Sequence, residues 1–224
     1  MRGKVIIFIV EGASDEETLM PWIEKRLNEL EIRVKIKIMS GDILTKYIEN
    51  TQKYEITSSN VKGEINKKLK EFMNSSDMRA DYLKWKDILK IYYVTDTDNC
   101  FKKNERHLEN KRECLKKMFK FEMIGASSPL KKFEVIFFGN NLEHVIYNET
   151  RQLTKEEKEM KSKEFCEKTL TEEWNFKEKF ENNGIKNWYS YEESYREIQE
   201  YTGRATNITA LIQEIETKKL KIIP

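Results

Sequence analysis

The 224-residue sequence lacks a long hydrophobic run. None of its apolar stretches approaches the roughly 18 residues that a membrane-spanning helix needs. The first segment, MRGKVIIFIVEG, also lacks the pattern of a cleavable signal peptide, because the acidic Glu11 follows the apolar residues too soon. We therefore expect a cytoplasmic protein without a membrane span.

Cysteine and histidine are scarce. The cysteines are Cys100, Cys114 and Cys166, an odd number at wide spacing, and the histidines are His107 and His144. A disulfide framework needs paired cysteines, and a structural zinc site needs closely spaced Cys and His ligands. The pattern therefore favours neither a disulfide nor a structural zinc site.

The sequence also lacks an excess of one charge. It has 41 basic and 39 acidic residues, a formal net charge of +2, so no overall positive field attracts a polyanion. A surface for nucleic acid would have to be local. The 36% of charged residues and 11% of aromatic residues are typical of a folded, soluble protein without low-complexity tracts.

What the sequence does contain is an alternation of strand and helix patterns. Apolar or alternating runs predict strands at residues 4–10, 33–39, 88–99 and 133–141. Apolar residues at helical spacing predict helices at about 14–30, begun by a capping box of Ser14 and Glu17, and at 105–120. This order predicts an α/β fold with a mostly parallel sheet and helices on its faces.

The predicted organisation has two parts. Residues 1–150 form the α/β core, with a helical crossover at about 42–87, and residues 151–224 form a charged, aromatic helical extension that packs on the core. Aromatic side chains of the extension could stack on single-stranded bases, but packing against the core is the simpler interpretation. A last amphipathic helix within 203–215 is predicted to begin at Thr206 or Asn207.

Acidic residues follow two of the predicted strands. Glu11 comes directly after the first strand, and Asp96 and Asp98 end the third in the segment TDTDN. In parallel sheets the carboxyl ends of the strands share one edge, where ligands bind. On an extended strand Asp96 and Asp98 would share a face, and Asp15 in the first helical turn could lean toward them.

Each acid also has an ordinary structural role when it is taken singly. Asp98 and Asn99 are common turn residues, and acids such as Asp15 complement the dipole at a helix start. The coincidence of acids at two buried strand ends favours a metal site instead, since Mg²⁺ prefers carboxylate oxygens.

The segments VIIFIVEGASDEETL and IYYVTDTDN resemble the Toprim pattern, a Glu-Gly after one strand and an Asp-x-Asp after a later one. Toprim proteins include topoisomerases, bacterial primases, recombination factors, ribosomal-RNA maturases and nucleases of the overcoming-lysogenization-defect type. The resemblance implies a Toprim-like (Rossmann-like) fold. It also implies that Glu11 is the general acid or base and a metal ligand, and that Asp96 and Asp98 bind Mg²⁺ or Mn²⁺.

The nuclease branch of that family adds an acid four residues after the glutamate and another beyond the fourth strand. By resemblance these metal ligands are Asp15 and Glu143. The wider arrangement is similar to RloB-like proteins, which lie beside an ATPase in bacterial operons of the phage-defence type. The segment from Asn140 to Glu143 and the Asn-Ile-Thr near the end carry this likeness.

The sequence departs from the Toprim pattern in two places. Thr97 stands where many members have proline, and no glycine follows Asp98 closely. Both departures disfavour a topoisomerase or a primase.

Three further features have two interpretations each. Lysines and arginines after the acidic segment, among them Lys102, Lys103 and Arg106, could bind a phosphate backbone or form a solvated helix face. His144 could carry a proton, although a structural role is simpler for a histidine without a partner histidine. Cys100 has no base beside it in the sequence, and we interpret it as incidental.

The sequence therefore predicts a Mg²⁺-dependent Toprim-type nuclease that hydrolyses phosphodiester bonds in DNA or RNA. Two alternatives remain open. One is a non-catalytic Toprim-fold interaction module that acts with a partner ATPase, and the other is a phosphatase or nucleotide hydrolase that uses the same metal chemistry.

Overall fold

The structure is a computed structural model, which describes residues 4–41, 43–44, 47–48, 53–102, 108–125, 128–181, 184–218 and 220. Its strands are β1 (Lys4–Val10), β2 (Val34–Ser40), β3 (Tyr47–Ile48), β4 (Lys53–Tyr54), β5 (Ile88–Asp96), β6 (Glu122–Gly125), β7 (Ser128–Phe138), β8 (Lys186–Asn187) and β9 (Ala205–Thr206). Its α-helices are α1 (Ala13–Glu29), α2 (Val61–Met73), α3 (Ser76–Ala80), α4 (Glu109–Met118), α5 (Leu142–Tyr147), α6 (Lys155–Leu170), α7 (Phe176–Glu181), α8 (Tyr191–Glu197) and α9 (Ile208–Glu216).

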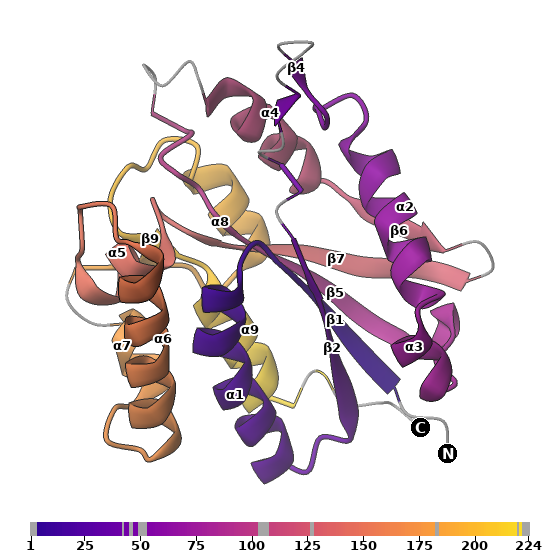
Figure 1. Ribbon diagram of the computed structural model, residues 1–224, viewed down its shortest axis with the longest axis horizontal. Coiled ribbons are helices and arrows are strands. Elements are labelled where there is room, and N and C mark those ends of the chain that lie inside the picture. Colours follow the sequence, from indigo (N-terminus) through magenta and orange to yellow (C-terminus); the bar gives the residue numbers. More distant parts are fainter. Residues whose placement is uncertain are drawn as a thin grey trace.

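One twisted sheet runs through the molecule (Figure 1), in the order β2-β1-β5-β7-β9-β8, with β6 paired to β7. The pairs β1–β2, β1–β5 and β5–β7 are parallel, whereas β6 and β9 run antiparallel to β7. The prediction of an α/β fold with a mostly parallel sheet is therefore confirmed.

Helices cover both faces of the sheet, and the residues of β1 show why. Val5, Ile7 and Ile9 point into a core formed with α2, α3 and α4, while Ile6 and Phe8 point into a second core formed with α1, α5, α6, α7 and α9. Since successive residues of a strand face opposite sides, a strand buried on both faces must be apolar throughout. The KVIIFIV run meets that requirement.

Several boundaries differ from those predicted. The N-cap of α1 is Gly12, two residues before the predicted Ser14. The backbone N–H of Gly12 donates to Asp15 rather than to Glu17, at 3.1 Å. Strand β5 ends at Asp96, so Asp98 lies beyond the strand. The short hairpin β3–β4 within the crossover and the strand β6 were not predicted.

The chain after residue 150 packs on this core and also extends its sheet. Strand β9 pairs with β7, and β8 with β9. Asn207 is the N-cap of α9, but its buried side chain bonds β7 instead of the helix: its Oδ1 accepts from the N–H of Phe137 at 3.0 Å and its Nδ2 donates to the carbonyl of Val135 at 2.8 Å. Asn207 thus continues the pairing of β7 with a side chain.

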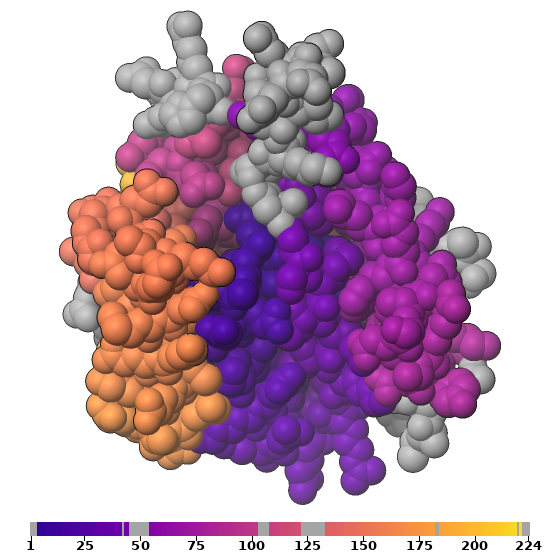
Figure 2. All heavy atoms as spheres, in the orientation of Figure 1, coloured from indigo at the N-terminus to yellow at the C-terminus, as the bar shows by residue number. Residues whose placement is uncertain are grey.

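In Figure 2, α6 (orange) forms one flank of the visible face, α1 and β2 (indigo and violet) its centre, and α2 and α3 (purple) the other flank. Among the residues described, no helix combines the length and the apolar character that crossing a bilayer would require.

Candidate acidic site at the sheet edge

The acids named from the sequence lie at the carboxyl ends of three neighbouring strands. Glu11 follows β1, Asp96 is the last residue of β5 and Glu143 lies in α5 directly after β7. Because β1, β5 and β7 are parallel and adjacent, these ends share one edge of the sheet. Asp15 joins them from the first turn of α1, and Asp98 from the loop after β5.

Glu11 is fixed by donors from β5. Its Oε1 accepts from the hydroxyl of Thr95 and, at 3.4 Å, from that of Tyr93. Its Oε2 accepts from the backbone N–H of Asp96 at 3.3 Å. Hydrogen bonds to both oxygens hold this carboxylate in one orientation at the end of the strand.

Asp98 and Glu11 are bridged by Lys111 of α4. The Lys111 Nζ lies 2.6 Å from Asp98 Oδ2 and 3.4 Å from Glu11 Oε1. The separation of Asp98 Oδ2 and Glu11 Oε1 therefore cannot exceed the sum of these two distances. Asp98 remains 45% exposed, whereas the Lys111 side chain is only 3% exposed.

Asp96 and Asp15 form the deeper part of the cluster. Asp96 Oδ1 accepts from the N–H of Leu142 at 3.0 Å, at the start of α5. Burial, reinforced by Glu11, raises the pKa of Asp15 from 3.8 to about 7. Burial also raises the pKa of Asp96 well above its ordinary range, with Asp15 as the next cause. Burial and neighbouring negative charges therefore favour the protonated form of both carboxyl groups.

Glu143 lies on the flank of the cluster. It is buried, its Oε1 is 3.8 Å from the Nζ of Lys158 on α6, and its charge contributes to the raised pKa of Asp15. Each of the five carboxylates named from the sequence therefore interacts electrostatically with at least one of the others, while Lys111 pairs with Glu11 and Asp98 and Lys158 with Glu143.

The loops after β5 and β7 are joined by polar contacts. The N–H of Asp98 donates to the carbonyl of Asn140 at 2.8 Å, the N–H of Asn140 donates to the Thr97 hydroxyl at 2.9 Å, and Asn99 Nδ2 donates to Asn140 Oδ1 at 2.6 Å. Asp98, Asn99 and Asn140 have φ of 48°, 59° and 69°. Left-handed backbone is strained for residues with a side chain, and it persists where surrounding contacts enforce it. These hydrogen bonds between the two loops hold the backbone of Asp98 in its left-handed conformation.

The expectation that Asp96 and Asp98 share a face of one strand is wrong. Because the chain leaves the extended conformation at Thr97 and turns left-handed at Asp98, Asp96 contacts α5 while Asp98 contacts α4. In this arrangement, no three acidic, histidine or cysteine side chains among the described residues are grouped as ligands of one metal ion. The donor set itself fits Mg²⁺, since it consists of carboxylate oxygens, the ligands that this ion prefers.

The other predicted site residues have varied positions. Lys102 is half-buried in the loop after β5 and lines a small hollow with Asn99 and Asn140, whereas Lys103 and Arg106 lie outside the described residues. His144 Nδ1 lies 3.3 Å from the carbonyl of Gly139, a local contact. Burial raises the pKa of the Cys100 thiol to about 12, which keeps it protonated at neutral pH.

Sequence reasoning missed the position of Lys111, which was grouped with the other lysines and arginines after the acidic segment. Lys111 lies on the buried stripe of α4, one helical turn before Cys114 and Leu115 and two turns before Met118. A lysine in register with an apolar stripe was the available signal, since lysine is almost never fully buried unless it is paired.

The C-terminal aromatics pack in the fold, as the simpler interpretation predicted. Trp188 is 1% exposed, and the hydroxyls of Tyr191 and Tyr195 bond to Glu214 and Glu134. Tyr189 is 52% exposed.

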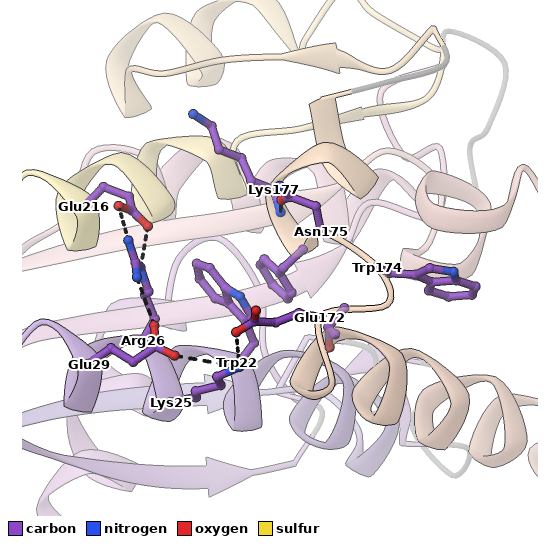
Figure 3. A pocket seen from close by; sticks show the side chains of 11 residues that line it. Trp22, Lys25, Arg26, Glu29, Glu172, Trp174, Asn175, Lys177 and Glu216 are labelled. Atoms are coloured by element: carbon purple, nitrogen blue, oxygen red, sulfur yellow. Dashed lines mark hydrogen bonds and ion pairs between the residues drawn. The ribbon is translucent and has the colours of Figure 1, made fainter.

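A larger hollow, about 580 Å³, lies beside the C-terminal half of α1 (Figure 3). Its charges are paired internally: Arg26 bonds Glu216 through two nitrogens, and Lys25 bonds Glu172 at 2.9 Å. Trp22 stacks on Phe176 with ring centroids 4.0 Å apart, while Trp174 points away from the ion pairs. The hollow lies where α1, the end of α6, α7 and α9 meet, and its ion pairs join these elements.

The functional interpretation of the acidic edge depends on the residues of this chain. No family model, no curated protein and no solved structure matches the sequence or the fold.

Proposed function

We propose that the protein is a Mg²⁺- or Mn²⁺-dependent nuclease of the Toprim type, which hydrolyses phosphodiester bonds in DNA or RNA. One observation carries the proposal: five carboxylates lie at or beside the carboxyl ends of the adjacent strands β1, β5 and β7, and two of them, Asp15 and Asp96, have raised pKa values. A protein gains no stability from such crowding, and perturbed carboxylates in clusters are frequent at functional sites.

The fold supports the same proposal. Parallel strands with acids at their carboxyl ends, in the order Glu-Gly and then Asp-x-Asp, are what a Toprim-like or Rossmann-like domain would contribute. The RloB-like arrangement adds a phage-defence context and a partner ATPase to the proposal.

The proposed ligands are Glu11, Asp15, Asp96, Asp98 and Glu143. Because no three of them are grouped as ligands of one ion in this arrangement, metal binding would require their side chains to rearrange. A divalent cation bound there would neutralise charge on the substrate phosphate and favour attack by water. In this proposal, three basic residues bind the phosphate backbone and position it: Lys102, Lys103 and Arg106.

Glu11 is the proposed proton carrier. Hydrogen bonds from Thr95 and Tyr93 orient its carboxylate at the end of β1. Lys111, which contacts Asp98, lies 3.4 Å from the same carboxylate. A general base must be held within hydrogen-bond reach of the proton that it removes, so this fixed orientation suits the role.

A second candidate is a non-catalytic interaction module that acts with a partner ATPase. The observation that favours it is Lys111, whose ammonium group already compensates Glu11 and Asp98 without a metal. A protein that never binds metal could be stabilised in this way.

The test combines calorimetry with a substrate panel. Mg²⁺ and Mn²⁺ are titrated into the wild type and Asp98→Asn, and both proteins are then incubated with DNA, RNA and nucleotides. The nuclease proposal expects millimolar or tighter binding and cleavage by the wild type, and loss of both in Asp98→Asn. Cleavage of nucleotides alone would favour the nucleotide-hydrolase alternative.

Absence of metal binding, together with absence of cleavage when the candidate ATPase is present, would contradict the nuclease proposal. The interaction module would then be the better description.

A further inference from the structure

Lys111 is a cation built into the acidic edge. It belongs to the buried stripe of α4, its side chain is 3% exposed, and its Nζ lies 2.6 Å from Asp98 Oδ2 and 3.4 Å from Glu11. Lys116 on the same helix pairs at the surface instead: it is 38% exposed and contacts Glu113 at 3.0 Å. Lys111 therefore differs from its neighbours in both depth and partners.

The Lys111 ammonium group is charged in this environment. Its Nζ lies within ion-pair distance of both Glu11 and Asp98, and two nearby negative charges favour the ammonium form. An ammonium group between two carboxylates supplies part of the positive charge that a metal ion would supply there.

We propose that Lys111 is the resident counter-cation of the acidic cluster, and that a divalent metal ion binds by displacing its ammonium group from Asp98. The inference rests on the proposed metal-dependent function and deepens it, because it makes Lys111 the residue that sets the metal affinity.

Space and charge both support displacement. A divalent ion held by Glu11 and Asp98 would compete with the Lys111 ammonium group for the same carboxylates, because Lys111 Nζ lies 2.6 Å from Asp98 Oδ2 and 3.4 Å from Glu11 Oε1. A dication and an ammonium group at such separations also repel each other.

The surrounding structure permits the exchange. Asp98 is 45% exposed, so an ion can reach it from solvent. The four-carbon stem of lysine is flexible, so its ammonium group can move while α4 stays packed.

The decisive experiment compares metal affinity among three proteins at pH 8: the wild type, Lys111→Met and Lys116→Met. Both variants remove one positive charge from α4, but only Lys111 contacts the cluster. We expect Lys111→Met to bind Mn²⁺ at least about tenfold more tightly than the wild type by calorimetry, and Lys116→Met to stay within about twofold, because an exposed charge is screened.

Equal or weaker Mn²⁺ binding by folded Lys111→Met, with binding by the wild type intact, would overturn the inference and leave the proposed function standing. Binding by Lys111→Met alone would support the inference. Absence of binding in all three proteins would overturn the inference together with the proposed metal dependence.

A second measurement uses the wild type, in case Lys111→Met does not fold. Acetylation by an amine-reactive reagent is quantified at Lys111 and Lys116 by mass spectrometry, with and without Mg²⁺. Displacement predicts a several-fold increase at Lys111 with Mg²⁺ and no change at Lys116. An unchanged Lys111 in the presence of saturating metal would overturn the inference.

Discussion

Replacing Asp15 by asparagine should stabilise the metal-free protein, and the gain should depend on pH. Asparagine keeps the shape of the side chain and an oxygen that can accept from the N–H of Gly12, now bonded at 3.1 Å. It removes the charge that burial and Glu11 make unfavourable. The direction is unusual, because most substitutions of buried residues destabilise a protein.

The pH dependence follows from the raised pKa. A carboxyl group whose pKa is higher in the folded than in the unfolded chain takes up protons on folding, so stability falls as pH rises between the two values. For Asp15 these values are 3.8 and about 7. The charge of Asp15 therefore costs nothing below about pH 4, costs more up to about pH 7, and costs a constant amount above it.

The shift sets the magnitude. Each pKa unit corresponds to about 1.4 kcal/mol, so the full difference gives an upper bound of roughly 4 kcal/mol. Asp15 is 8% exposed, so solvent screens it little, but it shares protons with the neighbouring acids. We expect Asp15→Asn to raise the free energy of unfolding by about 2 to 4 kcal/mol at pH 8, and by about 2 kcal/mol less at pH 5.

Urea unfolding in the presence of a chelator, from pH 5 to pH 8.5, measures the effect. Asp81 is a control for which the same substitution should have the opposite effect on stability, because hydrogen bonds from Lys35 and Lys37 lower its pKa. Asp81→Asn should therefore lose stability at pH 8. A gain for Asp15→Asn that does not change with pH, or a loss at pH 8, would refute the reasoning about the cluster.

Three further substitutions test other parts of the site and the fold. Asp98→Asn should lose the metal-induced rise in melting temperature because it removes the charge of a proposed ligand, while its circular dichroism stays unchanged because asparagine keeps the shape of the side chain. Asn140→Ala should lower the free energy of unfolding by about 1 to 2 kcal/mol in urea titrations, because alanine tolerates the φ of 69° poorly and loses the bond to Asn99; Asn140→Gly should recover part of this. Asn207→Leu should lower it by about 3 kcal/mol without changing metal affinity in calorimetry, because the N–H of Phe137 would be buried without a partner.

The parts of the fold that could be predicted are those where one short run of sequence is sufficient. KVIIFIV and ILKIYYV are apolar in nearly every position because their strands are covered on both faces, and a short run of this kind is typical of a buried parallel strand. The strands β3, β4, β8 and β9 have two residues each and carry no pattern. Their pairing depends on tertiary contacts, as when Asn207 bonds β7 with its side chain.

The sequence was sufficient to predict which edge of the sheet carries the acids, but not how their side chains are arranged there. Parallel strands bring Glu11 and Asp96 to one end of the sheet whatever the loops do. The direction of Asp98 depends on a left-handed turn that is held by Asn140, a residue of the loop after β7 that is distant in the sequence. Local sequence contains the turn-forming residues TDTDN but no information on their partner.

The charge balance of the edge was the least predictable feature, and it carries the strongest functional consequence. The formal charge of +2 averages over the whole chain, whereas Glu11 has a positive charge close to it, the Lys111 nitrogen 3.4 Å from its Oε1. That nitrogen is placed by the packing of Leu115 and Met118, its neighbours on the buried stripe of α4. Because core packing positions α4, any change that moves this helix also moves the cation that faces Asp98. The stability of the fold and the charge state of the acidic edge are therefore coupled through one helix.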